Sequence, residues 1–377
     1  MLWNRWADGR MRVSFLAPFL AILAMLFSGG LPGLPGQPGL PGLPGLPGSP
    51  GGTTPPLGGS GTTGPLPGHY FSGSYVNAAG TRNYLGYAPS TYKQGTAIPL
   101  VVALHGCTQS ADTFRQQTKF DNLAEAKNFI VVYPEQPSSA NPLDCWNWFN
   151  PSDMQRGSGE PSIIAGITDW VQQHYSVDPQ RTFLAGFSAG GAMAAVMGAT
   201  YPDKYAALGI GSGIQYGGES IDPTQAGREA YQAMGTFARP MPTLIFHGGQ
   251  DTTVPVANAD KLVRQWQTTA DLADDGAINA SVPTAPVKTL AAQSAGGQSY
   301  TVSRYDDGQG QEFVDYWLVP DMSHAWSGGC SCTAYSDPAG PDETTAMYDF
   351  FVSHPNPRQS PPAGPVTPLP TDLLGGR

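Results

Sequence analysis

The chain has 377 residues, of which only 13% are charged, and 29 Asp and Glu against 19 Lys and Arg give it a net charge of −10. This sparse, acidic charge without basic clusters argues against a nucleic-acid partner and against attraction to anionic membranes. Four cysteines fit an oxidising compartment, and no residues have the spacing of zinc or calcium ligands, so we expect no metal and no other cofactor.

The N-terminus is typical of a secretory signal, which we place at residues 1–30. An apolar run over 13–27 follows three arginines and precedes Ser28-Gly29-Gly30, and it is too short for a comfortable membrane span. An uncleaved anchor is the alternative, and Met11 is an alternative start. We therefore expect an extracellular protein without stable membrane contact after cleavage.

Residues 31–68 form a Gly/Pro-rich segment in which glycine recurs at every third position up to Gly51. The register is collagen-like, but so few triplets favour a stiff polyproline-type spacer over a triple helix. The tail 355–377 is Pro-rich and is predicted to be disordered. One domain, 69–354, lies between these segments, and we expect it to be monomeric.

Strand-like and helix-like segments alternate through 69–354, which predicts an α/β fold with a mainly parallel sheet and helices on both faces. Residues 273–298 are polar and lack a pattern, so we expect a surface insertion there. Helices are expected at 119–127, 163–174 and 260–269, a buried strand at 129–133, and paired strands at 300–305 and 313–319.

Two apolar runs end in loops with the composition of a catalytic site. The run 98–104 leads into His105-Gly106-Cys107, and the run 183–185 leads into Gly186-Phe187-Ser188-Ala189-Gly190 and a small-residue helix. A serine on such a strand–turn–helix is the nucleophile position of an α/β-hydrolase. We expect the backbone N–H groups of Cys107 and Ala189 to hold an oxyanion, and His105 to be structural.

The remaining members of a triad follow in the order Ser–Asp–His. Asp251 comes just after the strand-like run 242–246, and His324 follows the run 315–320. Asp321 is a rival for the acid, but it lies only three residues before His324 at the same strand end. Ser188, Asp251 and His324 together predict an acyl-enzyme mechanism, because a serine hydroxyl needs a base and the base needs an orienting carboxylate.

The chain resembles the extracellular polyhydroxybutyrate (PHB) depolymerase family, close kin of acetylxylan and feruloyl esterases. The resemblance covers roughly 75–351 and rests on four stretches, Leu104–Gln109, Cys145–Phe149, Gly186–Gly191 and His324–Gly329. It implies the same triad, with Cys107 as an oxyanion donor. Departures are Ser323 before the histidine, the Cys330-Ser331-Cys332 loop, and the lack of a domain-sized segment after 354, which makes attack on solid polymer less expected than ester hydrolysis.

Four cysteines allow three pairings, and we favour Cys107 with Cys145 and Cys330 with Cys332. A disulfide between Cys145 and one cysteine of the Cys330-Ser331-Cys332 loop stays open as the alternative. Trp146, Trp148 and Trp326 flank the predicted site in sequence. If they are exposed, they offer a flat apolar wall to a substrate, and otherwise they pack in the core.

We therefore expect a secreted serine carboxylic-ester hydrolase acting on poly- or oligo-hydroxyalkanoates. The alternatives are an acetylxylan or feruloyl esterase, a secreted peptidase with the same triad, and a non-enzymatic surface protein that acts through the collagen-like arm.

Overall fold

The computed structural model describes residues 66–356. The predicted signal segment 1–30, the linker up to residue 65 and the tail from 357 onward lie outside the described residues, so those three interpretations stay predictions. In the described part, no helix has the length and apolar character needed to cross a membrane.

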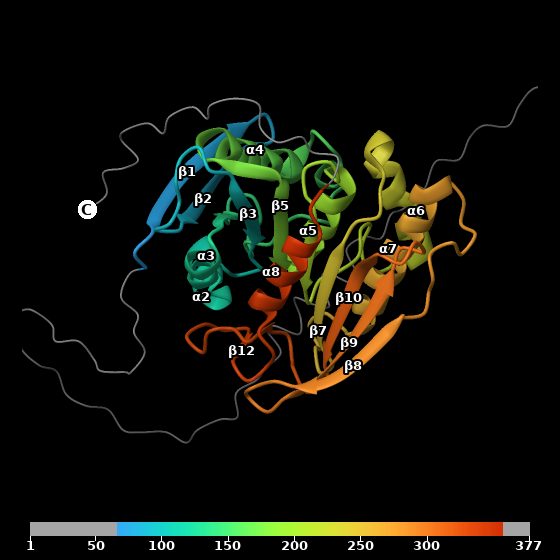
Figure 1. The fold of residues 1–377 in the computed structure, drawn as a ribbon. Helices are drawn as coiled ribbons and strands as arrows, with labels where there is room; N and C mark the ends of the chain where they lie inside the picture. The colour runs from blue at the N-terminus through green and yellow to red at the C-terminus, as the bar shows by residue number, and fades with distance from the viewer. Residues whose placement is uncertain (1–65, 357–377) are drawn as a thin grey trace, which may run out of the picture. The chain divides into compact units, whose positions relative to one another are not determined.

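The domain is built on one ten-stranded sheet (Figure 1). Six neighbouring strands in its middle run parallel, and an antiparallel pair extends each edge. In spatial order the strands are β1 (His69–Asn77), β2 (Gly80–Ala88), β4 (Ile130–Pro134), β3 (Ile98–Leu104), β5 (Val177–Phe187), β6 (Leu208–Gly211), β7 (Thr243–Gly248), β10 (Glu312–Val319), β9 (Ser299–Asp306) and β8 (Lys288–Gln293).

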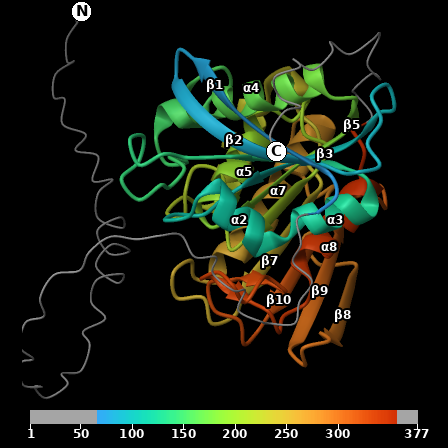
Figure 2. The same ribbon diagram turned by 90° about the vertical axis from the view of Figure 1, so that its left-hand side faces the viewer.

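Helices cover both faces of the sheet. One face packs against α4 (Gly159–His174), α5 (Ala189–Thr200), α6 (Pro223–Met234) and α7 (Ala257–Asp275). The other packs against α2 (Ala111–Thr118), α3 (Phe120–Lys127) and α8 (Glu343–Ser353). Figure 2 shows α2 and α3 side by side in the foreground. Short 3-10 turns lie at Pro151–Met154 and Gly235–Phe237, and β11 (Trp326–Ser327) pairs with β12 (Ser336–Asp337).

The central strands are apolar on both sides because helices cover both sides. In β3, Leu100 and Val102 join the core under α4–α7, whereas Val101 and Ala103 join the core under α2, α3 and α8. All four are fully buried. A parallel strand buried on both faces is a continuous apolar run, which is the pattern that predicted this strand.

The predicted α/β-hydrolase class, with its parallel sheet and two helical layers, is confirmed, but the expectation for 273–298 was wrong in part. Residues 288–293 form the edge strand β8, which pairs with β9. Every residue of β8 is exposed, so the segment has no apolar alternation that would distinguish it from a surface loop. The helix expected at 260–269 is longer and spans Ala257–Asp275.

The parallel arrangement gathers the predicted site. Cys107 follows β3, Ser188 follows β5, Asp251 follows β7 and His324 follows β10. These four strands run in the same direction, so the loops after them emerge at the same edge of the sheet.

Candidate active site

Ser188 sits on a strained turn between β5 and α5. Its backbone angles are φ 56° and ψ −118°, which few non-glycine residues adopt. The turn needs glycine on each side, because a Cβ on Gly186 would lie 2.1 Å from the carbonyl oxygen of Gly190, and a Cβ on Gly190 would lie 2.1 Å from that of Leu104. The Ser188 N–H donates to the Gly211 carbonyl at 2.9 Å, which ties the turn to β6.

The imidazole of His324 lies between the serine and a carboxylate. Its Nε2 is 3.0 Å from the Ser188 Oγ, and its Nδ1 is 2.7 Å from the Asp251 Oδ2. A carboxylate can only accept, so the Nδ1–H donates to Asp251 and Nε2 is left to accept the serine proton. A hydroxyl, imidazole and carboxylate linked in this way can generate an oxygen nucleophile.

Asp251 is held by its own turn as well as by the histidine. Its Oδ1 accepts hydrogen bonds from the N–H groups of Thr253, at 2.9 Å, and Val254, at 2.8 Å. Burial by itself would raise the pKa of Asp251, but the hydrogen bond to His324 and the donors around it lower that pKa below its ordinary value. The rival Asp321 is exposed, so the structure brings Asp251 and not Asp321 to the imidazole.

Two other histidines near these loops are fully buried. Nε2 of His105 accepts the Gln136 N–H at 3.0 Å, its Nδ1 lies 2.8 Å from the Gly106 carbonyl, and burial lowers its pKa to about 4. Nε2 of His247 lies 2.8 Å from the Val254 carbonyl, and burial lowers its pKa also. Both rings are thus engaged with backbone, as expected for His105.

The loop after β3 lies against Ser188. A Cβ on Gly106 would be 3.2 Å from the Ser188 Cβ, which is closer than most Cβ contacts, so a larger residue would require the neighbouring side chains to shift. The N–H of Gly106 donates to Gln109 Oε1 at 2.9 Å, and the N–H of Thr108 donates to the Leu143 carbonyl at 2.6 Å. Between them, the N–H of Cys107 has no acceptor among residues 66–356, and neither has the N–H of Ala189, the first residue of α5.

Both expected disulfides are formed. Cys107 pairs with Cys145 across a sequence separation of 38, so the loop after β3 is fastened to the segment 145–149. Cys330 pairs with Cys332 in the loop between β11 and β12. The N–H of Cys330 donates to the backbone carbonyl of Gln117 at 3.0 Å, so this second loop is attached to the end of α2.

Of the two alternatives for the three tryptophans, an exposed apolar wall or core packing, the structure shows core packing for two. Trp146 and Trp326 are fully buried. Trp146 packs near His105, and Trp326 packs edge-on against Phe114 while its Nε1–H donates to Thr344 at 2.9 Å. Both rings are buried by packing between neighbouring loops and helices. No local sequence pattern indicates how deeply a tryptophan side chain will be buried.

Trp148 is the member that stays partly exposed. It packs against Ala192, Ile214 and Val254. Ala192 lies four residues after Ser188, and Val254 lies three residues after Asp251. Trp148 therefore borders the loops that carry the serine and the aspartate, and its role in binding a substrate stays a prediction.

Two buried glutamines connect the loops and were not singled out in the sequence. Gln109 Nε2 donates to Gln117 Oε1 at 2.5 Å, and Gln117 Nε2 donates to the carbonyl of Tyr335. Gln109 belongs to the family-like stretch after β3, which was the available signal for it. Gln117 lies on a helix, and its side chain bonds Gln109, eight residues earlier, and the distant Tyr335, so no local pattern identifies it.

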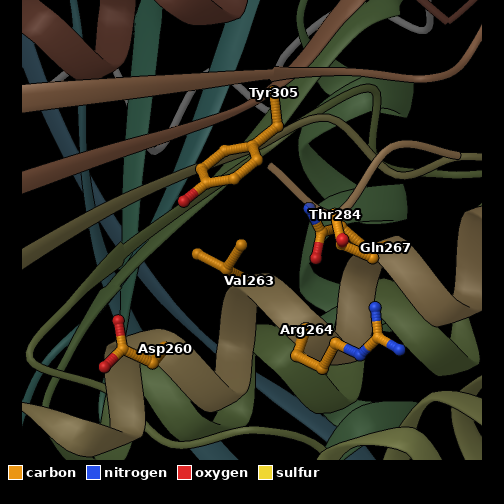
Figure 3. Close-up of a pocket in the computed structure, with 6 residues that line it drawn as sticks. All are labelled: Asp260, Val263, Arg264, Gln267, Thr284 and Tyr305. Carbon is orange, nitrogen blue, oxygen red and sulfur yellow. The ribbon is translucent and has the colours of Figure 1, made fainter. Parts of the chain in front are cut away.

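A separate hollow of about 370 Å³ lies between α7 and β9 (Figure 3). Figure 3 shows Tyr305 projecting from its strand toward Val263 and Asp260 on the helix. None of its six lining residues, Asp260, Val263, Arg264, Gln267, Thr284 and Tyr305, is a predicted site residue. No group of three or more His, Cys, Asp or Glu that could hold a metal ion occurs between residues 66 and 356.

The serine turn after a central parallel strand and the order Ser188, Asp251, His324 define an α/β-hydrolase. The fold matches that of the acetyl xylan esterase from Aspergillus awamori with a TM-score of 0.59 at 22% identity, covering 74% of this chain and 99% of that one. The family model described as esterase PHB depolymerase matches residues 83–284, more than half of the chain. The chain belongs to this family, and the matched region contains Ser188 and Asp251, whereas His324 lies beyond it.

Two curated relatives each match a little less than half of the chain. Poly(3-hydroxyalkanoate) depolymerase C of Paucimonas lemoignei is 38% identical over 183 residues, which are 45% of this chain and 44% of that protein. Acetylxylan esterase A of Emericella nidulans is 31% identical over 201 residues, which are 48% of this chain and 64% of that protein. The chain thus spans about half the length of the curated relatives it matches.

Proposed function

We propose that the protein is a serine carboxylic-ester hydrolase in which Ser188, His324 and Asp251 form the catalytic triad. The single observation that carries the proposal is the position of the His324 imidazole, 3.0 Å from the serine oxygen and 2.7 Å from the aspartate oxygen. The first distance lets His324 take the serine proton, and the second lets Asp251 hold the imidazole in the tautomer that can accept it.

In this mechanism, the Ser188 Oγ attacks the ester carbonyl carbon while Nε2 of His324 takes the serine proton. The N–H groups of Cys107 and Ala189 hold the developing oxyanion. Collapse of the intermediate breaks the bond to the alcohol oxygen, which receives the proton from His324, and leaves an acyl group on Ser188. Water then attacks the acyl-enzyme with His324 again as base, and the carboxylic acid departs. Asp251 keeps the imidazole in the productive tautomer throughout.

We propose short hydroxyalkanoate polymers or oligomers as substrates, and secretion as the route by which the enzyme meets them. Support comes from the family, from the poly(3-hydroxyalkanoate) depolymerase relative and from the signal-like N-terminus. An acetylated polysaccharide is the second candidate, because relatives and a fold neighbour are acetylxylan esterases. A monomer without metal or other cofactor suffices for this chemistry.

The test compares wild type with Ser188→Ala on p-nitrophenyl butyrate, then on a PHB suspension and on acetylated xylan. Turnover by wild type with a loss of several orders of magnitude in the variant supports the triad. Clearing of the suspension selects the polyester, whereas acetate release from xylan selects the sugar ester. Equal rates for both proteins on p-nitrophenyl butyrate would contradict the proposed function.

A further inference from the structure

An aromatic side chain outside the predicted site lies beside the triad histidine. Tyr335 is the last residue before β12, and its ring centroid is 6.1 Å from that of His324, with the two ring planes at 75°. Tyr335 is 38% exposed, whereas His324 is 9% exposed. The ring therefore presents a free aromatic surface immediately beside the imidazole.

The backbone of Tyr335 is held in an unfavourable conformation. Its φ is 58°, in the left-handed region that large side chains rarely adopt. Its carbonyl accepts hydrogen bonds from the Trp326 N–H at 2.8 Å and from the side chain of Gln117. The Cys330–Cys332 disulfide lies three residues earlier in the same loop. A strained backbone conformation persists only where its surroundings hold it. These contacts therefore hold the Tyr335 backbone, and with it the start of the side chain, in a fixed position.

The direction of proton transfer says which part of an ester would meet this ring. The Nε2 of His324 takes the proton from Ser188 and returns it to the departing alcohol oxygen, so the alcohol portion lies on the histidine side of the serine. Tyr335 is on that side. Trp148, by contrast, packs on Ala192, Ile214 and Val254, in the loops of the serine and the aspartate.

We propose that Tyr335 is a substrate-contact residue that packs against the alcohol portion of the ester and favours esters whose alcohol part is large and apolar. The proposal rests on the proposed function and adds the residue that discriminates between alcohols. An aromatic ring provides a broad apolar face at small conformational cost, which suits a repeating ester chain or a planar alcohol.

The test uses two esters with the same acyl group, p-nitrophenyl butyrate and methyl butyrate, so that both pass through one acyl-enzyme. Tyr335→Asn removes the ring and tolerates the left-handed backbone, while Tyr335→Phe keeps the ring. Tyr335→Asn should lower kcat/KM about five-fold for the p-nitrophenyl ester and hardly at all for the methyl ester. Tyr335→Phe should behave as wild type on both esters.

Phe237→Ala is the matched control, because Phe237 is also an exposed aromatic but precedes β7, at the opposite end of the sheet from the triad. Phe237→Ala should leave kcat/KM unchanged for both esters. If Tyr335→Asn does not fold, Tyr335→Gly carries the same expectation, since glycine also accepts a positive φ.

If Tyr335→Asn lowers kcat/KM equally for the two esters, the assignment of Tyr335 to the alcohol portion is overturned. A loss that grows with acyl length from p-nitrophenyl acetate to hexanoate would also overturn it, since Tyr335 would then contact the acyl chain. An inactive wild type, or activity that survives in Ser188→Ala, would refute the proposed function itself and this inference with it.

Discussion

The side chain of Gln117 donates a hydrogen bond to the backbone carbonyl of Tyr335, 218 residues further along the chain. The same amide accepts from Gln109, which in turn accepts from the N–H of Gly106. Two buried amides thus connect the loop beside Ser188 with the loop beside His324. This connection joins the segment next to the proposed oxyanion donor to the residue whose ring lies beside the proposed base.

Replacing Gln117 should therefore affect both stability and turnover. We expect Gln117→Met to lower the free energy of unfolding by about 1–3 kcal/mol, because it leaves the buried Nε2 of Gln109 without its acceptor and removes one of the two donors to the Tyr335 carbonyl. It should lower kcat more than it changes KM. Urea denaturation and steady-state kinetics check this, with Gln116→Met as the control.

Gln116 is the neighbour on the same helix, but it is exposed and its side chain donates to the side chain of Asp112 on the surface. Its replacement should change stability by about 0.5 kcal/mol or less. Equal effects of the two substitutions would show that the buried amide connection contributes nothing particular.

Asp251 and Asp321 were rivals in the sequence, and they make a matched pair of variants. Asp251→Asn should lower kcat by about 10⁴-fold, because an amide opposite Nδ1 favours the wrong tautomer of His324. Asp321→Asn should retain near wild-type activity, since this side chain is exposed. Hydrolysis of p-nitrophenyl butyrate measures both, and a severe loss in Asp321→Asn would disprove the assignment of the acid.

The two disulfides should differ in their effect on stability. Cys107–Cys145 closes a loop with a sequence separation of 38, so Cys107→Ser with Cys145→Ser should cost about 2–4 kcal/mol. Cys330–Cys332 spans two residues and restricts the unfolded chain little, so its removal should cost about 1 kcal/mol or less.

Activity should follow the same order, because the first disulfide holds the residue whose N–H is the proposed oxyanion donor. Denaturation curves and kcat of the two double variants check both statements. A larger loss of stability for the Cys330 and Cys332 pair would contradict the loop-length argument.

His105 should make the protein sensitive to acid. Its folded-state pKa is lowered to about 4 by burial, below the unfolded value of about 6.5. The unfolded chain therefore binds a proton before the folded one does, and stability falls as pH drops between these two values. As the pH falls from about 7 to about 5, this group lowers the free energy of unfolding by about 2 kcal/mol.

The check is urea denaturation at both pH values for wild type and His105→Asn. The variant is expected to be less stable at neutral pH, because Gln136 and Gly106 lose a partner, but to lose less on acidification. If wild type and His105→Asn lose the same free energy of unfolding between the two pH values, His105 does not cause the sensitivity to acid.

Much of the site could be predicted from local pattern. The apolar runs at β3, β5, β7 and β10 are recognisable because parallel strands are covered on both faces. Since such strands end at one edge, the residues that follow them were expected to meet there. Glycine at 106, 186 and 190 marks the close approaches of backbone that the turn requires.

Side-chain depth and long-range pairing were decided only by the tertiary structure. Trp146 and Trp326 are indistinguishable in sequence from Trp148, yet packing of distant helices and loops buries the first two completely. β8 has no apolar alternation because no layer covers it, and its strand identity depends on hydrogen bonds to β9.

The sequence by itself thus determined the class of fold and the order of Ser188, Asp251 and His324, because both follow from residue type and short-range spacing. It favoured one pairing of the cysteines, which the tertiary structure then decided. The tertiary structure decided between Asp251 and Asp321, revealed the Gln109–Gln117 connection and placed Tyr335 beside His324. These depend on distances between segments up to 218 residues apart, which the chain acquires only when the sheet and its loops are packed.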